Sequence, residues 1–139
     1  IGARAFRGCA LTSVNCPKLQ EINDEAFVDC TQLVSAAFAE VQTVRWCAFG
    51  SNDSLEEIWL PKVNNIERDE IFRNCPNLRA VHIGTELDYV CRMEDGNLSI
   101  DQSVTTIYVP DALVEDYKVA TNWSLYAGVI KGESEAPTD

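Results

Sequence analysis

The chain has 139 residues, enough for one domain, and its 11 Lys and Arg against 22 Asp and Glu give a net charge of −11. This charge argues against nucleic acid or an anionic membrane as partner, because both are bound through cations. The hydrophobic share of 46% is too high for a disordered chain. No apolar run approaches the ~20 residues of a membrane-spanning helix, so we expect no membrane insertion. The chain begins with Ile1 and shows no signal-peptide pattern, so we expect a processed product or a segment cut from a longer protein.

From its first residue the chain repeats itself every 21 or 22 residues. Four segments begin at Ile1, Ile22, Val44 and Ile66, and each contains a phenylalanine followed by an apolar-x-x-apolar-x-apolar cluster. A fifth cluster follows a degenerate stretch, residues 90–103, in which the repeat register is not visible. The five clusters are Leu11-Val14-Cys16, Leu33-Ala36-Phe38, Leu55-Ile58-Leu60, Leu78-Val81-Ile83 and Val104-Ile107-Val109.

Each cluster predicts a short strand, because side chains alternate along a strand and the last two apolar residues then face one side. A single short strand cannot bury that face, but stacked parallel copies can. Pro17, Pro61 and Pro110 follow three of the clusters and end their ladders. The phenylalanine segments predict single helical turns, such as one in which Asn23 or Asp24 caps the turn and Phe27 enters the core.

The repeat unit I-G-x-x-A-F-x-x-C-x-x-L-x-x-I-x-I-P resembles the BspA-like leucine-rich repeat of bacterial surface and secreted proteins. The segments beginning at Ile1, Ile22 and Ile66 carry its positions, and the ending Ile107–Ser124 looks like the C-terminal cap common in that family. The resemblance implies an α/β repeat solenoid, a right-handed superhelix with short parallel strands and a C-terminal helical cap. It also implies a binding role, often adhesion to host proteins, with no catalytic centre.

These patterns predict three parts of the chain. Residues 1–110 are expected to form about five leucine-rich repeats, with an incomplete N-terminal unit. Residues 111–132 are expected to form the cap, beginning with a helix capped by Asp111, and 133–139 a flexible polar tail. No polar capping segment precedes Ile1, so Phe6, Leu11 and Val14 are expected to present an apolar end that a partner or further repeats would cover.

Six cysteines invite a disulfide or a zinc site, but the chain has no C-x-x-C and a single histidine. We expect buried, reduced thiols at Cys9, Cys16, Cys30 and Cys75, with a Cys9–Cys30 bridge as the alternative. Cys47 is expected to be exposed, with Cys91 as a second candidate. The motifs of serine hydrolases, zinc proteases and nucleotide-binding loops are absent, so no enzyme activity, metal or cofactor is expected.

One residue of each strand lies between the two inward positions and therefore faces outward. These positions hold Asn15, Ala37, Trp59, His82 and Tyr108, so three successive strands carry planar side chains. We expect Trp59, His82 and Tyr108 to form an exposed strip on the concave strand face, with Glu57 and Arg79 orienting a ligand.

The sequence thus predicts a non-enzymatic binding or adhesion module of a cell-surface or secreted bacterial protein, with an unidentified protein or glycan as its ligand. Unpaired thiols leave a cytoplasmic location open. The alternative function is a structural spacer that only carries or positions another domain. For the strip itself, the alternative is that it only stabilises the sheet through cross-strand contacts.

Overall fold

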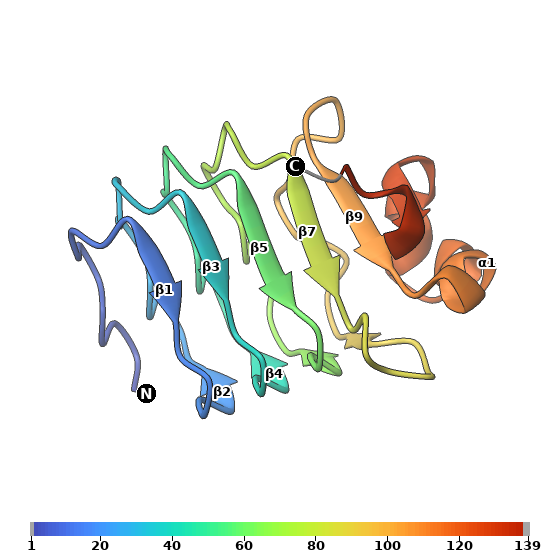
Figure 1. Ribbon diagram of the computed structural model, residues 1–139, viewed down its shortest axis with the longest axis horizontal. Coiled ribbons are helices and arrows are strands. Elements are labelled where there is room, and N and C mark those ends of the chain that lie inside the picture. Colours follow the sequence, from blue (N-terminus) through green and yellow to red (C-terminus); the bar gives the residue numbers. More distant parts are fainter. Residues whose placement is uncertain (1, 138–139) are drawn as a thin grey trace.

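The computed structural model describes residues 2–137, and its repeats form successive coils of chain stacked side by side (Figure 1). Each apolar cluster contributes one strand to a six-stranded sheet in which neighbouring strands run parallel. In sheet order its strands are β1 (Ser13–Asn15), β3 (Ser35–Ala37), β5 (Glu57–Leu60), β7 (Ala80–Ile83), β9 (Thr106–Val109) and β10 (Ile130–Gly132).

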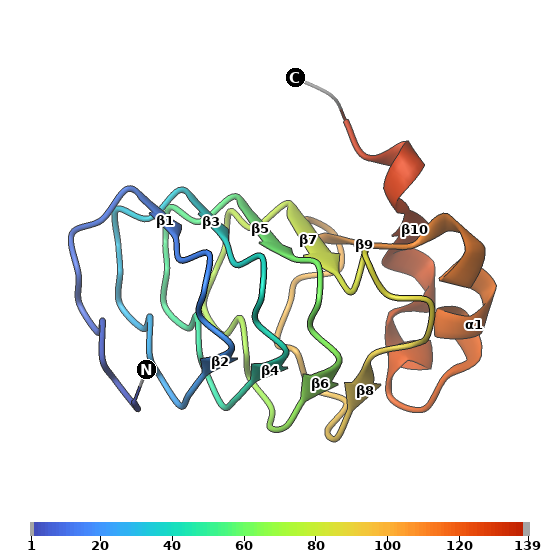
Figure 2. The same cartoon turned by 60° about the horizontal axis from the view of Figure 1, so that its bottom comes forward.

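A second parallel sheet of four strands runs along another side of the coils (Figure 2). Its strands are β2 (Glu21–Ile22), β4 (Thr43–Val44), β6 (Asn65–Ile66) and β8 (Arg92–Met93). Strands of two residues with one buried side chain give no alternating pattern, so the sequence does not predict this sheet. The degenerate stretch contributes only β8, in this second sheet, so β7 and β9 remain direct neighbours.

The C-terminal helices lie beside β9 at the end of the stack (Figure 1). They are the 3₁₀ helix η1 (Asp111–Leu113), α1 (Val114–Val119) and the 3₁₀ helix η2 (Trp123–Val129). The Tyr117 hydroxyl accepts a hydrogen bond from the Cys91 backbone at 2.9 Å, and the Trp123 indole donates one to the Cys91 carbonyl at 2.7 Å. Their buried rings therefore meet the last coil through polar contacts as well as through packing. None of the helices within residues 2–137 has the length and apolar character needed to span a membrane.

The repeated phenylalanines stack on one another through the core. Phe27 lies 5.1 Å from Phe6 and 5.6 Å from Phe49 between ring centroids, and Phe49 lies 5.9 Å from Phe72. The rings of each pair are within 14° of parallel. A residue that recurs at one position of every coil thus builds a continuous column of apolar side chains.

The phenylalanine segments are turns rather than the single helical turns that the sequence predicts. Glu25 has a φ of 54° and Cys47 a φ of 52°, values of the left-handed region that no α-helix contains. In this conformation Glu25 and Phe27 donate their backbone N–H groups to the next coil, at Trp46 and Ala48. Bonds between coils thus replace bonds within a helix, and Asp24 accepts from the Trp46 backbone instead of capping its own turn.

The thiols depart from expectation at several positions. Cys30 is buried as predicted, but Cys47 and Cys91 are buried too, so the prediction that they are exposed is wrong. The sulfur of Cys47 lies against Gly50, and a methyl group added at Gly50 would collide with it. Cys9, Cys16 and Cys75 are only half-buried, because Cys9 and Cys16 belong to the first coil and Cys75 lines a surface hollow.

At the N-terminal end, Phe6 is 37% and Leu11 43% exposed, as the sequence predicts, whereas Val14 is buried. The ring of Phe6 is covered on one face by Phe27. The exposed part is therefore the outer surface of the apolar column.

Candidate functional site

The outward positions of the six-stranded sheet align across the strands. Asn15 is in register with Ala37, Ala37 with Trp59, Trp59 with His82, and His82 with Tyr108. The structure thus places Trp59, His82 and Tyr108 side by side on β5, β7 and β9. We call these three residues the aromatic strip.

The rings of the aromatic strip stack face to face. The Trp59 and His82 centroids are 5.2 Å apart with 12° between the ring planes, and those of His82 and Tyr108 are 5.1 Å apart with 22°. Separations of this order are those of attractive aromatic pairs. The parallel ladder imposes the arrangement, because it holds equivalent side chains one strand apart.

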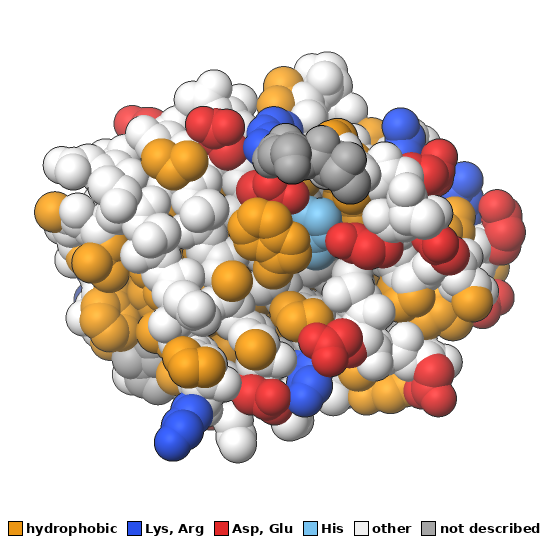
Figure 3. Space-filling view, viewed as in Figure 1, with side chains coloured by type: hydrophobic (Ala, Val, Ile, Leu, Met, Phe, Trp, Pro, Cys, Tyr) orange, Lys and Arg blue, Asp and Glu red, His pale blue; other side chains and the backbone are white. Residues whose placement is uncertain are grey.

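The expectation that the whole strip is exposed is wrong. His82 is only 2% exposed and Tyr108 6%, whereas Trp59 is half-buried. Figure 3 shows the histidine between a large hydrophobic side chain and acidic groups, with little of its surface in view. The cause is a C-terminal segment of the chain itself: β10 sets Lys131 beside Tyr108, and η3 (Glu133–Glu135) then places Glu133 against His82.

His82 is held between two carboxylates. Its Nδ1 lies 2.8 Å from both carboxylate oxygens of Glu133, and its Nε2 lies 2.7 Å from Oε2 of Glu57. A carboxylate only accepts hydrogen bonds, and a neutral imidazole has one N–H to donate. Both contacts are therefore hydrogen bonds only when the ring carries two protons and a positive charge.

Glu57 connects the strip to the neighbouring charges. Its side chain is 17% exposed, and its Oε1 lies 3.4 Å from Nη2 of Arg79. Arg79 also lies 3.6 Å from Glu56. Ala80 is the residue directly opposite Glu57 in the ladder, and its small side chain leaves the carboxylate room to reach His82. Glu57 and Arg79 thus lie next to the strip, and Glu57 is bound to it.

The segment that covers the strip is fastened by a few local contacts. The Ser134 backbone donates a hydrogen bond to Oδ1 of Asp111 at 3.0 Å, and the Gly132 backbone donates one to Glu135 at 3.3 Å. Asp111, predicted as the cap of its own helix, makes no side-chain cap there and binds this segment instead. The domain boundaries at 110 and 132 remain predictions. Residues 133–135, expected to belong to a flexible tail, form a 3₁₀ turn with these contacts.

Glu133 is the residue of this site that the sequence does not predict. Polar composition places it in a tail, and no repeat position marks it. The alternating burial of Ile130, Lys131 and Gly132 is visible only in the structure, because Gly132 has no apolar side chain to mark it in the sequence. Three residues are too few for a strand pattern, so no sequence signal marks Glu133.

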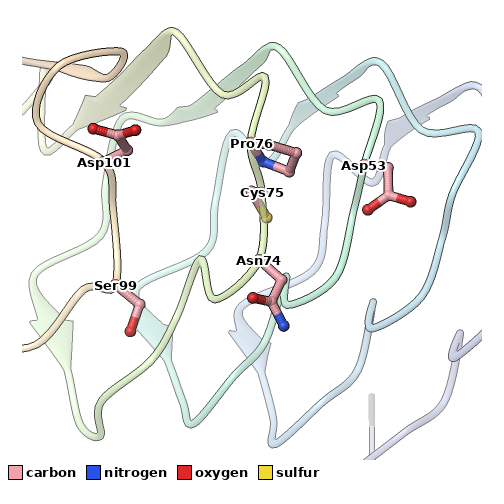
Figure 4. Close-up of a pocket in the computed structure, with 6 residues that line it drawn as sticks. All are labelled: Asp53, Asn74, Cys75, Pro76, Ser99 and Asp101. Carbon is pink, nitrogen blue, oxygen red and sulfur yellow. The ribbon is translucent and has the colours of Figure 1, made fainter.

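The surface also has a shallow hollow of about 310 Å³ behind the strands (Figure 4). It is lined by Asp53, Asn74, Cys75, Pro76, Ser99 and Asp101. Burial raises the pKa of the Cys75 thiol to about 12, so this sulfur stays protonated at neutral pH and is a poor nucleophile. Within residues 2–137, no group of three or more His, Cys, Asp or Glu side chains could hold a metal ion.

Comparison with known proteins agrees with this architecture of parallel strands, two sheets and few helices. Residues 1–93 match the BspA type leucine-rich repeat region, with six copies of the repeat. The match covers more than half of the 139 residues. A search of the curated proteins found no match to the chain. The chain therefore belongs to the BspA type leucine-rich repeat family.

Proposed function

We propose that this protein is a non-enzymatic binding module that recognises another protein through the aromatic strip, on the outward face of β5, β7 and β9. Leucine-rich repeats of this family are interaction or repeat modules, which supports a binding role in general terms. The single observation that carries the specific site is the stacking of Trp59, His82 and Tyr108 beside charged groups of both signs.

Aromatic and arginine side chains are enriched where proteins bind one another. Trp59 offers an accessible indole face, and Arg79 beside it is exposed. A planar or apolar group of a ligand stacks on the indole, while Arg79 and Glu57 set its orientation. A glycan ring stacking on Trp59 is the other ligand that this geometry accommodates.

In this proposal the coils form a right-handed solenoid, and α1 with η2 acts as the cap that closes its last layer. The burial of Tyr117, Trp123 and Tyr126 supports a capping role, because these rings shield apolar side chains of the final coil. The proposed setting is the surface of a bacterial cell or the medium outside it, as is typical of BspA type repeats. The exposed Phe6 and Leu11 offer a second contact surface at the N-terminal end.

The proposal is tested by screening the chain against arrays of host proteins and glycans and repeating each hit with Trp59→Ala. Trp46→Ala is the matched control, because Trp46 is also half-buried but lies in a turn after β4, away from the strip. We expect Trp59→Ala to weaken binding by about tenfold or more, the usual effect of removing a central aromatic residue. Equal effects of the two variants would contradict the proposal.

A second candidate function is that of a structural spacer, and one observation favours it. Side chains of neighbouring coils pair with each other along the stack, as in Arg4–Glu25 at 2.9 Å, Arg45–Glu67 at 2.6 Å and Lys62–Glu40 at 3.0 Å. Polar groups that satisfy one another are less available to a ligand. A chain that binds nothing in the screen, with or without Trp59, would support the spacer.

A further inference from the structure

We infer that the aromatic strip binds the carboxylate of an acidic peptide segment, and that Glu133 of the chain itself occupies this binding position in the structure. The inference rests on the proposed function and adds to it the chemistry of the ligand and a means of regulation. Residues 133–135 would act as a removable strap, which an acidic segment of a partner protein displaces.

The first support is the geometry at His82. Glu133 presents both carboxylate oxygens to Nδ1 at 2.8 Å, which is how a charged ligand would meet a protonated ring. The opposite nitrogen is held by Glu57 at 2.7 Å, from a neighbouring strand of the same sheet. Glu57 therefore orients the ring, and Nδ1 is the position that accepts a carboxylate from outside the sheet.

The second support is the local charge. Around the strip, Arg79 and Lys131 are cationic and exposed, and His82 is cationic when both of its contacts are hydrogen bonds. The anions that face these cations are Glu57, the first residue of β5, and Glu56, the residue before β5. Without Glu133 the strip has the two cations Arg79 and Lys131 against the two anions Glu56 and Glu57, although the whole chain carries −11. The negative charge of the chain is therefore balanced at the strip, and a ligand carboxylate meets no excess of negative charge there.

The third support is the way the strap is attached. Figure 2 shows η3 standing off the body of the molecule, on the outward side of the six-stranded sheet. The Glu133 side chain is 40% exposed, although its partner His82 is only 2% exposed. None of the three strap residues, 133–135, is buried. A segment with so little buried surface can be displaced without unfolding the sheet.

A strap of the same chain competes strongly with a ligand in solution. A tethered group is present at an effective concentration of the order of millimolar, so a free peptide must exceed that concentration or bind more tightly. Two consequences follow. An acidic peptide should bind the unaltered chain weakly, and it should bind better once the Glu133 carboxylate is removed.

The test uses the full chain and a peptide of the sequence Lys-Gly-Glu-Ser-Glu-Ala-Pro, residues 131–137, with both ends blocked so that only side chains carry charge. Binding is followed by NMR at the imidazole of His82, which is unambiguous because the chain has one histidine. The variants are Glu133→Gln and Glu133→Ala. Glu115→Gln, which removes an exposed carboxylate of α1, is the control for net charge.

We expect the peptide to bind both Glu133 variants about tenfold more tightly than it binds the unaltered chain or Glu115→Gln, as one charge-assisted hydrogen bond allows. A peptide with Gln at both Glu positions should not compete. Adding Trp59→Ala to Glu133→Gln should remove the gain, because the apolar groups of the peptide then lose the indole face on which they pack.

Two results would overturn the inference. If the His82 signals of Glu133→Gln and Glu133→Ala equal those of the unaltered chain, the strap does not occupy the strip. If the signals change but the peptide does not bind, Glu133 has a structural role only. In either case Trp59→Ala still decides the proposed function in the array screen, so the two failures are distinguishable.

Discussion

Oε2 of Glu133 lies 2.8 Å from Nδ1 of His82, although 51 residues separate the two in the sequence. The parallel ladder makes this contact possible, because β10 pairs with β9, and β9 with β7. The chain therefore returns to its own sheet after the C-terminal helices and sets a carboxylate on the middle ring of the strip. Glu133, one partner of this contact, lies outside the repeats that define the family match.

Gly132 is the residue that allows this return. A methyl group there would collide with Oδ1 of Asp111, the atom that also accepts the Ser134 hydrogen bond. Gly132→Ala should therefore push the exposed Asp111 side chain away from Ser134 and loosen residues 133–135, while lowering the free energy of unfolding by only about 1 kcal/mol, the net worth of the lost hydrogen bond. Hydrogen exchange at 133–135 and the His82 NMR signals measure the loosening.

Gly128→Ala is the matched control, because an added methyl group at Gly128 meets no atom within 4 Å. We expect it to leave the His82 signals and the exchange at 133–135 unchanged. Equal effects of the two alanine variants would mean that Asp111 does not hold the segment.

Asn52 is a buried polar side chain that joins two neighbouring coils of the repeats. Its amide donates hydrogen bonds to the carbonyls of Phe27 at 3.0 Å and Phe49 at 2.6 Å, and its oxygen accepts from the Cys30 backbone at 2.9 Å. Asn52→Ala leaves three buried backbone groups without this partner and should cost about 2–5 kcal/mol of unfolding free energy, measured in urea.

Asn52→Cys should cost less than Asn52→Ala, because a thiol can restore one of the three hydrogen bonds. The equivalent residue of the next coil is Cys75, whose thiol donates to the Phe49 carbonyl at 3.1 Å, and that of the previous coil is Cys30, whose thiol donates to Phe6 at 3.2 Å. A thiol at position 52 can therefore satisfy Phe27 in the same way. If both variants lost the same stability, the three hydrogen bonds would not be what the position contributes.

The repeat register could be predicted from the sequence because each coil repeats one apolar cluster, and stacking fixes which residues become neighbours. The alignment of Trp59 with His82 follows from that periodicity, whereas that of His82 with Tyr108 depended on whether the degenerate stretch adds a strand to this sheet, and it adds none. The burial of His82 could not be predicted, because it depends on Glu133, which lies outside the repeats. The turns at Glu25 and Cys47 were also beyond prediction, since side-chain patterns do not reveal backbone bonds between coils.

Trp59 and Tyr108 should differ in what they contribute to stability. Tyr108 is 6% exposed between His82 and the strand that carries Lys131, whereas Trp59 is half-buried at the open end of the strip. Thermal or urea unfolding should show a loss of about 3–5 kcal/mol for Tyr108→Ala, as for a large buried ring, and about 1 kcal/mol for Trp59→Ala. A larger loss for Trp59→Ala would make Trp59 a structural residue.

Alkaline pH should destabilise the protein through its buried thiols. Burial raises the pKa of Cys30 and of Cys75 to about 12, above the ordinary value of 9.0 that applies in the unfolded chain. Between these values the unfolded chain has lost thiol protons that the folded chain keeps, so the free energy of unfolding falls as pH rises from 9 toward 12. Urea unfolding across this range measures the slope.

Cys75→Asn is the matched variant for this prediction, because Asn52 occupies the same position in the previous coil. It removes one titrating thiol, so its slope should be shallower than that of the unaltered chain. Identical slopes would show that the Cys75 thiol titrates alike in the folded and unfolded states.

Hydrogen–deuterium exchange of the full chain shows whether the aromatic strip binds the ligand and whether the chain's own strap covers it. The measurement compares the free chain with the chain saturated by a ligand from the array screen. We expect slower exchange in β5, β7 and β9 and faster exchange at residues 133–135, because the ligand takes the place of Glu133. Slower exchange confined to β2, β4, β6 and β8, with residues 133–135 unchanged, would contradict this expectation.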